Sequence, residues 1–405
     1  MTRTEVVMLQ KYWISPRGTG GSERIIDRVS NALVSNNIST AVLTCGEFAK
    51  GAEIPQNFNC TMPLFDGRMR PVHEIPSIPQ ITEYVCQNWR KIDVIQIGWG
   101  YEHYPEQLIK ILELPIPKIF TMLETGHFDQ MTQNFSKKEE KEKFMELLRQ
   151  RLDAIVAISQ PLKNEAQNLG FNDVELIYGP VPDNFHPVSF EQKMINRQKL
   201  ELPQNRVIYL YTGRLVAEKG VDHIVKAWKR LNPKVRDNSA LVLVGGYSSD
   251  DRDLRNEVLQ LQSDFTDNVY LIGPVDDEIK LGEIFSSADV FIYPTRHQEG
   301  LAMAPAEAMA SGLPLITTEY AVSHTGMSDL VIPHRNSLIY SSEEGIKGLT
   351  ALLDTFQNKQ LRDEYSSQAI AHIKELKMAP RSIADKYSNL YQRLLNKYDL
   401  PSSRG

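Results

Sequence analysis

Two glutamates beside a short helix make the chemically most informative pattern in the chain. In YPTRHQEGLAMAPAEAMASGLPLITT (residues 293–318), a loop carries Glu299 and leads into a helix expected over about 304–311, with Gly312 as its C-terminal stop. Glu307 lies on that helix, eight positions after Glu299, so both carboxylates can reach one ligand from different ends. Because carboxylates accept hydrogen bonds from hydroxyl groups, the pattern indicates a ligand rich in hydroxyls, such as a sugar.

Three main-chain amides complete this candidate site. Gly300, Leu301 and Ala302 lie at or just before the expected helix N-terminus, where N–H groups and the helix dipole favour an anion. We therefore expect a diphosphate to bind there. The alternative is that Glu307 is an ordinary helix-face residue and Glu299 only stabilises the helix dipole.

A cationic turn, YTGRLVAEKG, follows another expected strand. Gly213, Arg214 and Lys219 precede an amphipathic helix in this segment. A guanidinium can bind phosphate through two parallel hydrogen bonds, and a nearby ammonium adds a point charge. The turn predicts a phosphate site, with a surface turn whose cations pair with Glu218 as the alternative.

The glycine-rich segment RGTGGSER lies between the first expected strand and the first expected helix. Gly18, Gly20 and Gly21 lack side chains where the backbone must turn, and the following helix amides favour an anion. A plain turn capped by Ser22 explains the same residues. The segment is not a clean GxGxxG fingerprint, so it only weakly favours a nicotinamide-dinucleotide site.

Asp251 and Asp253 have a spacing that can chelate a divalent metal. They also open an expected helix, where acidic residues are favoured by the dipole alone, and no His or Cys ligand set accompanies them. We interpret them as a surface helix start and predict no metal site.

The elements that must position these residues alternate between strands and helices. A length of 405 residues corresponds to roughly two to three domains at about 150 residues each. Apolar β-branched runs alternate with amphipathic stretches, which predicts parallel sheets with crossover helices. In the first half, the expected strands cover residues 4–10, 39–45, 93–98, 118–123, 153–159 and 174–179.

A proline-rich linker separates this half from a second α/β unit. Pro180, Pro182 and Pro187 favour extended backbone. Beyond them, strands are expected over residues 206–213, 240–246, 268–273, 289–294 and 314–318. The predicted fold is α/β, with two Rossmann-like parallel-sheet domains facing each other across a cleft, where such sheets bind ligands. The predicted domains are 1–182 and 188–380, and a helix over about 381–400 either ends the second domain or packs back onto the first.

Composition excludes several classes of protein. Hydrophobic residues make up 41% and charged residues 24%, which is typical of globular proteins, and the net charge of −6 predicts no nucleic-acid partner. Residues 137–151 mix six basic with four acidic residues, so we interpret them as a solvated helix face rather than a membrane or acceptor patch. Neither a signal peptide nor an apolar run of membrane-spanning length is recognised, and nothing indicates peripheral membrane contact. We therefore expect a cytoplasmic protein whose three cysteines are reduced.

The segments GxGGSER, GRLVAEKG and EGLAMAPAEAMASGLPLI, in this order and spacing, resemble the retaining nucleotide-sugar glycosyltransferases of family GT4, which have the GT-B fold. The resemblance covers nearly all of residues 206–353 and, in the first half, mainly the glycine loop and its helix. It implies that Glu299 contacts the donor sugar and Glu307 holds the ribose. It also implies that Arg214 and Lys219 hold the donor phosphates, and that the glycine loop lies near diphosphate and acceptor.

The resemblance assigns two further positions in outline. Val275 corresponds to the main-chain contact with the nucleotide base, and His127 is the nearest match to a family histidine, with His103 as its competitor. Two departures concern donor and acceptor identity rather than reaction class. Ala302 stands where the family usually has glycine, and residues 319–326 lack the usual paired glycines.

The leading hypothesis is therefore a metal-independent, retaining glycosyltransferase without a cofactor. It would move a sugar from a UDP-, GDP- or ADP-sugar to the hydroxyl of a sugar-containing, lipid-linked or small-molecule acceptor. An NAD(P)-dependent oxidoreductase leaves Arg214, Lys219, Glu299 and Glu307 unexplained. A non-catalytic, two-lobed sugar-binding protein is the third hypothesis, although such proteins are typically exported.

Overall fold

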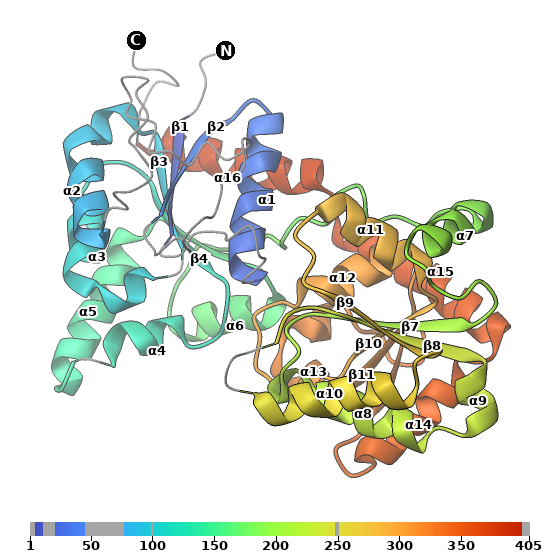
Figure 1. The fold of residues 1–405 in the computed structure, drawn as a ribbon. Coiled ribbons are helices and arrows are strands. Elements are labelled where there is room, and N and C mark those ends of the chain that lie inside the picture. The colour runs from blue at the N-terminus through green and yellow to red at the C-terminus, as the bar shows by residue number, and fades with distance from the viewer. Residues whose placement is uncertain are drawn as a thin grey trace. The chain divides into compact units, whose positions relative to one another are not determined.

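The computed structural model describes residues 5–10, 21–44, 77–98, 100–133, 135–247 and 251–398. The chain forms two compact units (Figure 1). The N-terminal unit consists of residues 1–180 together with residues 378–405, and the C-terminal unit consists of residues 181–377.

The N-terminal unit is built on a six-stranded parallel sheet with the order β2-β1-β3-β4-β5-β6. All six of its strands were predicted from the sequence. Its strands are β1 (Glu5–Gln10), β2 (Ser39–Thr44), β3 (Val94–Ile97), β4 (Lys118–Met122), β5 (Ala154–Ala157) and β6 (Val174–Leu176). Its helices are α1 (Gly21–Ser35), α2 (Ile78–Asn88), α3 (Pro105–Leu112), α4 (His127–Thr132), α5 (Lys138–Arg151), α6 (Gln160–Asn168) and α16 (Pro380–Lys397), with the 3₁₀ turns η1 (Trp89–Lys91) and η2 (Tyr101–His103).

The C-terminal helix α16 packs on the N-terminal sheet beside α1 (Figure 1). Its Tyr391 hydroxyl donates to Oε1 of Gln96 on β3 at 2.7 Å, and the Gln96 amide nitrogen lies 3.4 Å from the Tyr387 hydroxyl. The same amide donates to Thr121 on β4 at 2.8 Å. Since all these side chains are buried, paired polar groups fix α16 to the middle of the sheet.

The C-terminal unit repeats the architecture with a six-stranded parallel sheet of order β12-β11-β10-β7-β8-β9. Its strands are β7 (Val207–Thr212), β8 (Ser239–Val244), β9 (Val269–Gly273), β10 (Val290–Tyr293), β11 (Leu315–Thr318) and β12 (Ser337–Tyr340). The sequence predicted the first five of these. The edge strand β12 was missed: its apolar run is limited to Leu338, Ile339 and Tyr340, with polar residues on both sides.

Helices cover both faces of this second sheet (Figure 1). One face carries α7 (Phe190–Lys199), α11 (Glu278–Ser287), α12 (Met303–Ala310) and α15 (Lys359–Leu376). The other carries α8 (Val221–Arg230), α9 (Pro233–Asp237), α10 (Arg252–Asp264), α13 (Glu319–His324) and α14 (Gly345–Thr355). The 3₁₀ turns are η3 (Ala217–Lys219) and η4 (Gly326–Asp329). Sheets covered on both faces have almost wholly buried strands, which is why these strands are continuous apolar runs.

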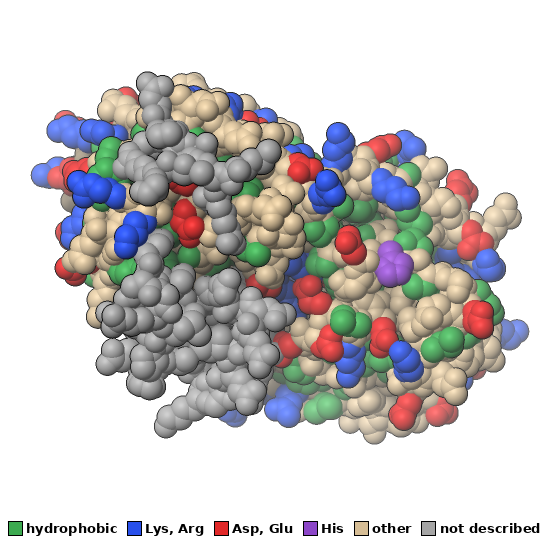
Figure 2. Space-filling model, turned by 90° about the horizontal axis from the view of Figure 1, so that it is seen from above, with side chains coloured by type: hydrophobic (Ala, Val, Ile, Leu, Met, Phe, Trp, Pro, Cys, Tyr) green, Lys and Arg blue, Asp and Glu red, His purple; other side chains and the backbone are tan. Residues whose placement is uncertain are grey.

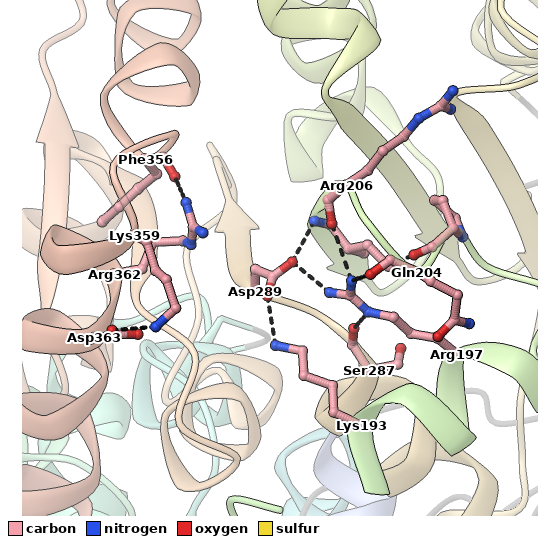
Figure 3. Close-up of polar contacts among 12 residues, drawn as sticks. Lys193, Arg197, Gln204, Arg206, Ser287, Asp289, Phe356, Lys359, Arg362 and Asp363 are labelled. Carbon is pink, nitrogen blue, oxygen red and sulfur yellow. Dashed lines mark hydrogen bonds and ion pairs between the residues drawn. The ribbon is translucent and has the colours of Figure 1, made fainter. Parts of the chain in front are cut away.

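A partly buried ion cluster attaches α7 to this sheet (Figure 3). Asp289, just before β10, accepts from Nζ of Lys193 at 2.6 Å, from Nη2 of Arg197 at 2.6 Å and from the main-chain amide of Ile208 at 2.7 Å. Arg197 is only 3% exposed, and its Nε donates to the Ser287 carbonyl at 2.9 Å. These neighbouring cations hold the pKa of the Asp289 carboxyl below its usual range, although its burial acts in the opposite direction.

The described residues on one face of the molecule mix charges of both signs. On the face shown in Figure 2, Lys and Arg side chains lie among Asp and Glu side chains rather than in a field of one sign. On α5, Phe144, Met145 and Leu148 are buried, while Arg149 pairs with Glu142 and Glu146. This arrangement is that of a solvated helix face with one apolar stripe. Within the described part of the chain, no helix is long and apolar enough to cross a membrane.

Candidate functional site

The loop carrying Lys219 and the loop carrying Glu299 meet in the C-terminal unit. Their strands, β7 and β10, are hydrogen-bonded neighbours that run in parallel, so their carboxyl ends lie side by side. The Lys219 Nζ lies 2.9 Å from Oε1 of Glu299, and the two side chains are 12% and 17% exposed. Two residues 80 positions apart thus form one partly buried ion pair at the edge of the sheet.

The Glu299 carboxylate has further partners from the same loop. The Tyr293 hydroxyl lies 2.8 Å from Oε1 and 3.0 Å from Oε2, and the Thr295 hydroxyl donates to Oε1 at 3.2 Å. Burial raises the pKa of Tyr293 well above its ordinary value, and the negative charge of Glu299 raises it further. The phenol therefore stays protonated and donates to the carboxylate.

Arg214 lies in a different environment from Lys219. Its guanidinium is 54% exposed and donates to Glu218 at 2.9 Å. A hydrogen bond holds its main chain in place, because the buried Tyr211 hydroxyl donates to the Arg214 carbonyl at 2.9 Å. Of the two cations expected to pair with Glu218 in a plain surface turn, only Arg214 does so, and Lys219 faces Glu299 instead.

Arg296 joins the two loops. Its main-chain amide donates to the Glu218 carbonyl at 2.8 Å, and its guanidinium donates to the Ala217 carbonyl and, at 2.6 Å, to the Asp222 carboxylate. A second guanidinium nitrogen lies 2.9 Å from Nε2 of His223. These contacts hold η3, which carries Lys219, against the loop that carries Glu299.

Close backbone approach at this edge requires glycine. Gly220 has φ +77°, and a Cβ there would lie 2.0 Å from the Pro294 carbonyl oxygen. Gly245 has φ +147°, and a Cβ there would lie 1.8 Å from the Gly213 carbonyl oxygen. Since neither position has room for a side chain, glycine is what allows the strand-end loops to pack this closely.

The helix α12 begins immediately after the three predicted amide positions. Ala302 is its N-cap residue and makes no side-chain cap bond, while Gly300 and Leu301 precede it. Gly312 follows the helix with φ +81°, which agrees with the predicted stop. Glu307 lies on α12 and is 3% exposed. Burial of this carboxyl argues against an ordinary solvated helix-face residue.

Other predicted positions of this unit lie on the same edge of the sheet. Val275 follows the carboxyl end of β9 and precedes α11. Asp251 is the N-cap residue of α10, as expected for a helix start, and its Oδ2 accepts the Ala217 amide at 3.0 Å. Asp251 therefore helps to hold η3. Among the residues with assigned positions, no group of three or more His, Cys, Asp or Glu could hold a metal ion.

The predicted histidines lie in the N-terminal unit. His127 is fully buried at the start of α4, and its Nε2 lies 3.3 Å from the Leu123 amide and 3.2 Å from the Glu124 amide. Burial, with a smaller effect of His103, lowers the pKa of His127 to about 4. The ring is therefore neutral near pH 7 and accepts both amides. His103 is exposed in η2, which packs against α4.

The glycine loop of the N-terminal unit is described only at its end. Gly21 is the first residue of α1, whereas Gly18 and Gly20 lie outside the described residues. The expected turn from β1 into α1 is therefore represented by Gly21 alone.

Sequence reasoning missed four side chains that build the Glu299 site. Tyr293 is the last residue of β10, Thr295 and Arg296 lie between β10 and Glu299, and Tyr211 is the penultimate residue of β7. Tyr211 and Tyr293 stack with ring centroids 6.5 Å apart and an interplanar angle of 16°. One signal was available, because two tyrosines near the ends of strands otherwise rich in aliphatic residues mark a place where buried hydroxyls need partners.

Comparison with known proteins gives this arrangement a family. Residues 192–372 match the family described as Glycosyl transferases group 1, and this segment contains the Lys219–Glu299 pair and α12. This segment of the chain is a match to the group 1 glycosyltransferases. An uncharacterised glycosyltransferase of Methanocaldococcus jannaschii is 28% identical over 257 residues, which cover 62% of this chain and 61% of that protein. The capsular polysaccharide biosynthesis glycosyltransferase CapM of Staphylococcus aureus is 26% identical over 254 residues, covering 60% of this chain and 62% of CapM.

The chain spans about three fifths of the length of these curated relatives. Solved structures agree in fold along nearly the whole chain. Anabaena HepE in complex with UDP superimposes with a TM-score of 0.71 at 16% identity, covering 96% of this chain and 100% of HepE. A sucrose-phosphate synthase of Thermosynechococcus elongatus gives a TM-score of 0.72 at 19% identity, covering 98% of this chain and 100% of that one. Two six-stranded parallel sheets with helices on their faces, together with these likenesses, confirm the predicted GT-B fold class.

Proposed function

We propose that this protein transfers a sugar from a nucleoside diphosphate sugar to an acceptor hydroxyl, with retention of the anomeric configuration. The observation that carries the proposal is the Lys219–Glu299 pair, in which a cation suited to phosphate lies 2.9 Å from a carboxylate suited to sugar hydroxyls. A nucleoside diphosphate sugar contains both a phosphate and a sugar, and the bond that joins them is the bond that the reaction breaks.

The remaining residues of the C-terminal unit take roles around this pair. Arg214 and the amides of residues 300–302 bind the diphosphate, Glu307 binds the ribose, and Val275 meets the base through its main chain. In the N-terminal unit, the glycine loop serves the diphosphate and the acceptor. His127 lies at the carboxyl edge of β4 as a neutral ring rather than as an acid.

The reaction breaks the bond between the anomeric carbon and the diphosphate oxygen. The acceptor oxygen forms a new bond on the same face of the sugar, and its proton passes to the departing phosphate oxygen. The growing charge on the diphosphate is met by Lys219, Arg214 and the amides before α12, which are preorganised for it. Since these groups supply the counter-charge, we expect turnover to persist in EDTA.

UDP-sugars are the first donors to test. Structures of HepE have been determined with UDP and with UDP-glucose. Several relatives are named for polysaccharide biosynthesis, among them CapM of Staphylococcus aureus and the teichuronic acid glycosyltransferase TuaC of Bacillus subtilis. We therefore propose a UDP-sugar donor and a saccharide acceptor.

A donor screen tests the proposal. The protein is incubated with UDP-glucose, UDP-N-acetylglucosamine, GDP-mannose and ADP-glucose, with and without EDTA, and thermal shift and release of nucleoside diphosphate are measured. We expect at least one donor to stabilise the protein and to be turned over, and the Lys219→Met variant to lose most of that turnover. Stabilisation by NAD or NADP without any response to these donors would overturn the proposal in favour of an oxidoreductase.

A further inference from the structure

The two oxygens of the Glu299 carboxylate are used unequally. Oε1 faces the Lys219 ammonium, the Tyr293 hydroxyl and the Thr295 hydroxyl at 2.9, 2.8 and 3.2 Å. Among the described residues, Oε2 has one partner, the same Tyr293 hydroxyl at 3.0 Å. A carboxylate offers about four lone-pair sites, so three donors on one oxygen leave the other oxygen with acceptor capacity.

We propose that Tyr293 is a positioning residue for sugar recognition, which holds Oε1 of Glu299 in the protein and presents Oε2 to a hydroxyl of the donor sugar. This inference rests on the function proposed above. Tyr293 would touch the carboxylate and not the substrate.

The surroundings of Tyr293 suit such a role. Its ring stacks with those of Tyr211 and Phe291, whose centroids lie 6.5 and 6.1 Å away at interplanar angles of 16° and 14°. Its side chain projects from β10, a strand buried along its whole length. A hydroxyl on a stacked ring of a central strand has little freedom to move, whereas Glu299 belongs to a loop. The strand therefore fixes the orientation of the loop carboxylate.

A fixed acceptor oxygen discriminates between sugars. Epimers differ in the direction of a single hydroxyl, and a buried polar group left without its partner strongly disfavours the wrong epimer. If the Tyr293 hydroxyl is removed, Glu299 keeps Lys219 and Thr295 but can rotate toward either epimer. Contacts to the nucleoside diphosphate do not involve Tyr293 and should not change.

The test compares two buried tyrosine hydroxyls. Tyr293→Phe removes the hydroxyl that contacts Glu299. Tyr209→Phe, the matched control, removes a fully buried hydroxyl on β7 that contacts the Leu353 carbonyl and Gln357, away from the site. For both variants and the wild type, kcat/KM is measured with the preferred donor of the screen and its C4 epimer, starting with UDP-glucose and UDP-galactose. The Kd of the free nucleoside diphosphate and the melting temperature are measured in parallel.

In Tyr293→Phe we expect the ratio of kcat/KM between the epimers to fall by about tenfold, the scale of one hydrogen bond to a charged group. The nucleoside diphosphate Kd should stay at the wild-type value, and Tyr209→Phe should keep the wild-type ratio. A second variant, Thr295→Val, should lower the same ratio by a smaller factor. An unchanged ratio in Tyr293→Phe, or a weakened nucleoside diphosphate affinity of the same size, would overturn the inference while leaving the proposed function intact. A wild-type protein that turns over no nucleotide sugar would remove the proposed function, and the inference with it.

Discussion

Removal of the Lys219 ammonium should slow the chemical step. The Lys219→Met variant keeps an apolar stem of similar length and deletes the positive charge that lies 2.9 Å from Oε1 of Glu299. Lys219 is 12% exposed, so water screens it poorly, and η3 is fixed in place by Arg296 and Asp251. One preorganised electrostatic partner of a leaving group contributes about 2–4 kcal/mol, so kcat should fall by roughly 30- to 1000-fold.

Arg214 offers a comparison within the same site. Its guanidinium is 54% exposed and already paired with Glu218, so solvent screening should make the effect of Arg214→Met on kcat smaller than that of Lys219→Met. Both variants are assayed by steady-state kinetics on the donor, with folding checked by circular dichroism. Lys359→Met, which removes an exposed lysine of α15 paired with Asp363, is the control for loss of a positive charge.

The reasoning makes kcat the quantity that must change. Loss of charge stabilisation in the transition state lowers kcat, whereas loss of equal binding in both states raises KM alone. Wild-type kcat in both Lys219→Met and Arg214→Met would refute the leaving-group assignment. A fall in kcat of the same size for Lys359→Met would show that loss of any positive charge has this effect, and would refute a specific role of Lys219.

Three further outcomes are expected. Glu307→Gln should raise the donor KM by about tenfold with kcat nearly unchanged, because a ribose contact is remote from the bond that breaks; a dominant loss of kcat in steady-state kinetics would contradict that role. Asp289→Ala should lower the free energy of unfolding by about 3–5 kcal/mol in urea titrations, because it removes the carboxylate partner of the buried Arg197 guanidinium and of the partly buried Lys193. Asp363→Ala in the exposed pair of Figure 3 should change it by less than about 1 kcal/mol. The pKa of His127 is about 4 in the folded protein and about 6.5 in the unfolded chain, so the unfolded chain binds the proton more readily. The free energy of unfolding should therefore fall by up to about 3 kcal/mol as pH drops from 6.5 toward 4. His127→Gln should reduce this pH dependence in urea titrations at pH 7 and pH 5.

Local sequence signals were sufficient for the class of fold. Eleven of the twelve strands of the two sheets were visible as apolar runs, because strands of a sheet covered on both faces need apolar side chains on both sides. The stop of α12 was also visible, since Gly312 is the residue type that adopts a positive φ after a helix. In the same way, the acidic start of α10 near Asp251 followed from the helix dipole.

Spacing along the chain likewise brought out Lys219, Glu299 and Glu307 as a candidate group. A strand end, a charged residue and a helix start in that order can be recognised without coordinates, because all three are local. That Lys219 would face Glu299 while Arg214 would face Glu218 was not decided by spacing. The adjacency of β7 and β10 decides it, since strands far apart in sequence become neighbours only in the sheet order.

The supporting shell of the site was decided entirely by tertiary structure. Tyr293 and Tyr211 resemble ordinary core aromatics in the sequence. Only the structure shows that their hydroxyls donate to the Glu299 carboxylate and to the Arg214 carbonyl, respectively. In the sequence Arg296 is an ordinary loop cation. The structure shows that its guanidinium joins the loop that follows β10 to the segment that follows β7. Periodicity reports which side chains are buried, whereas the partners of a buried polar group depend on packing between distant segments.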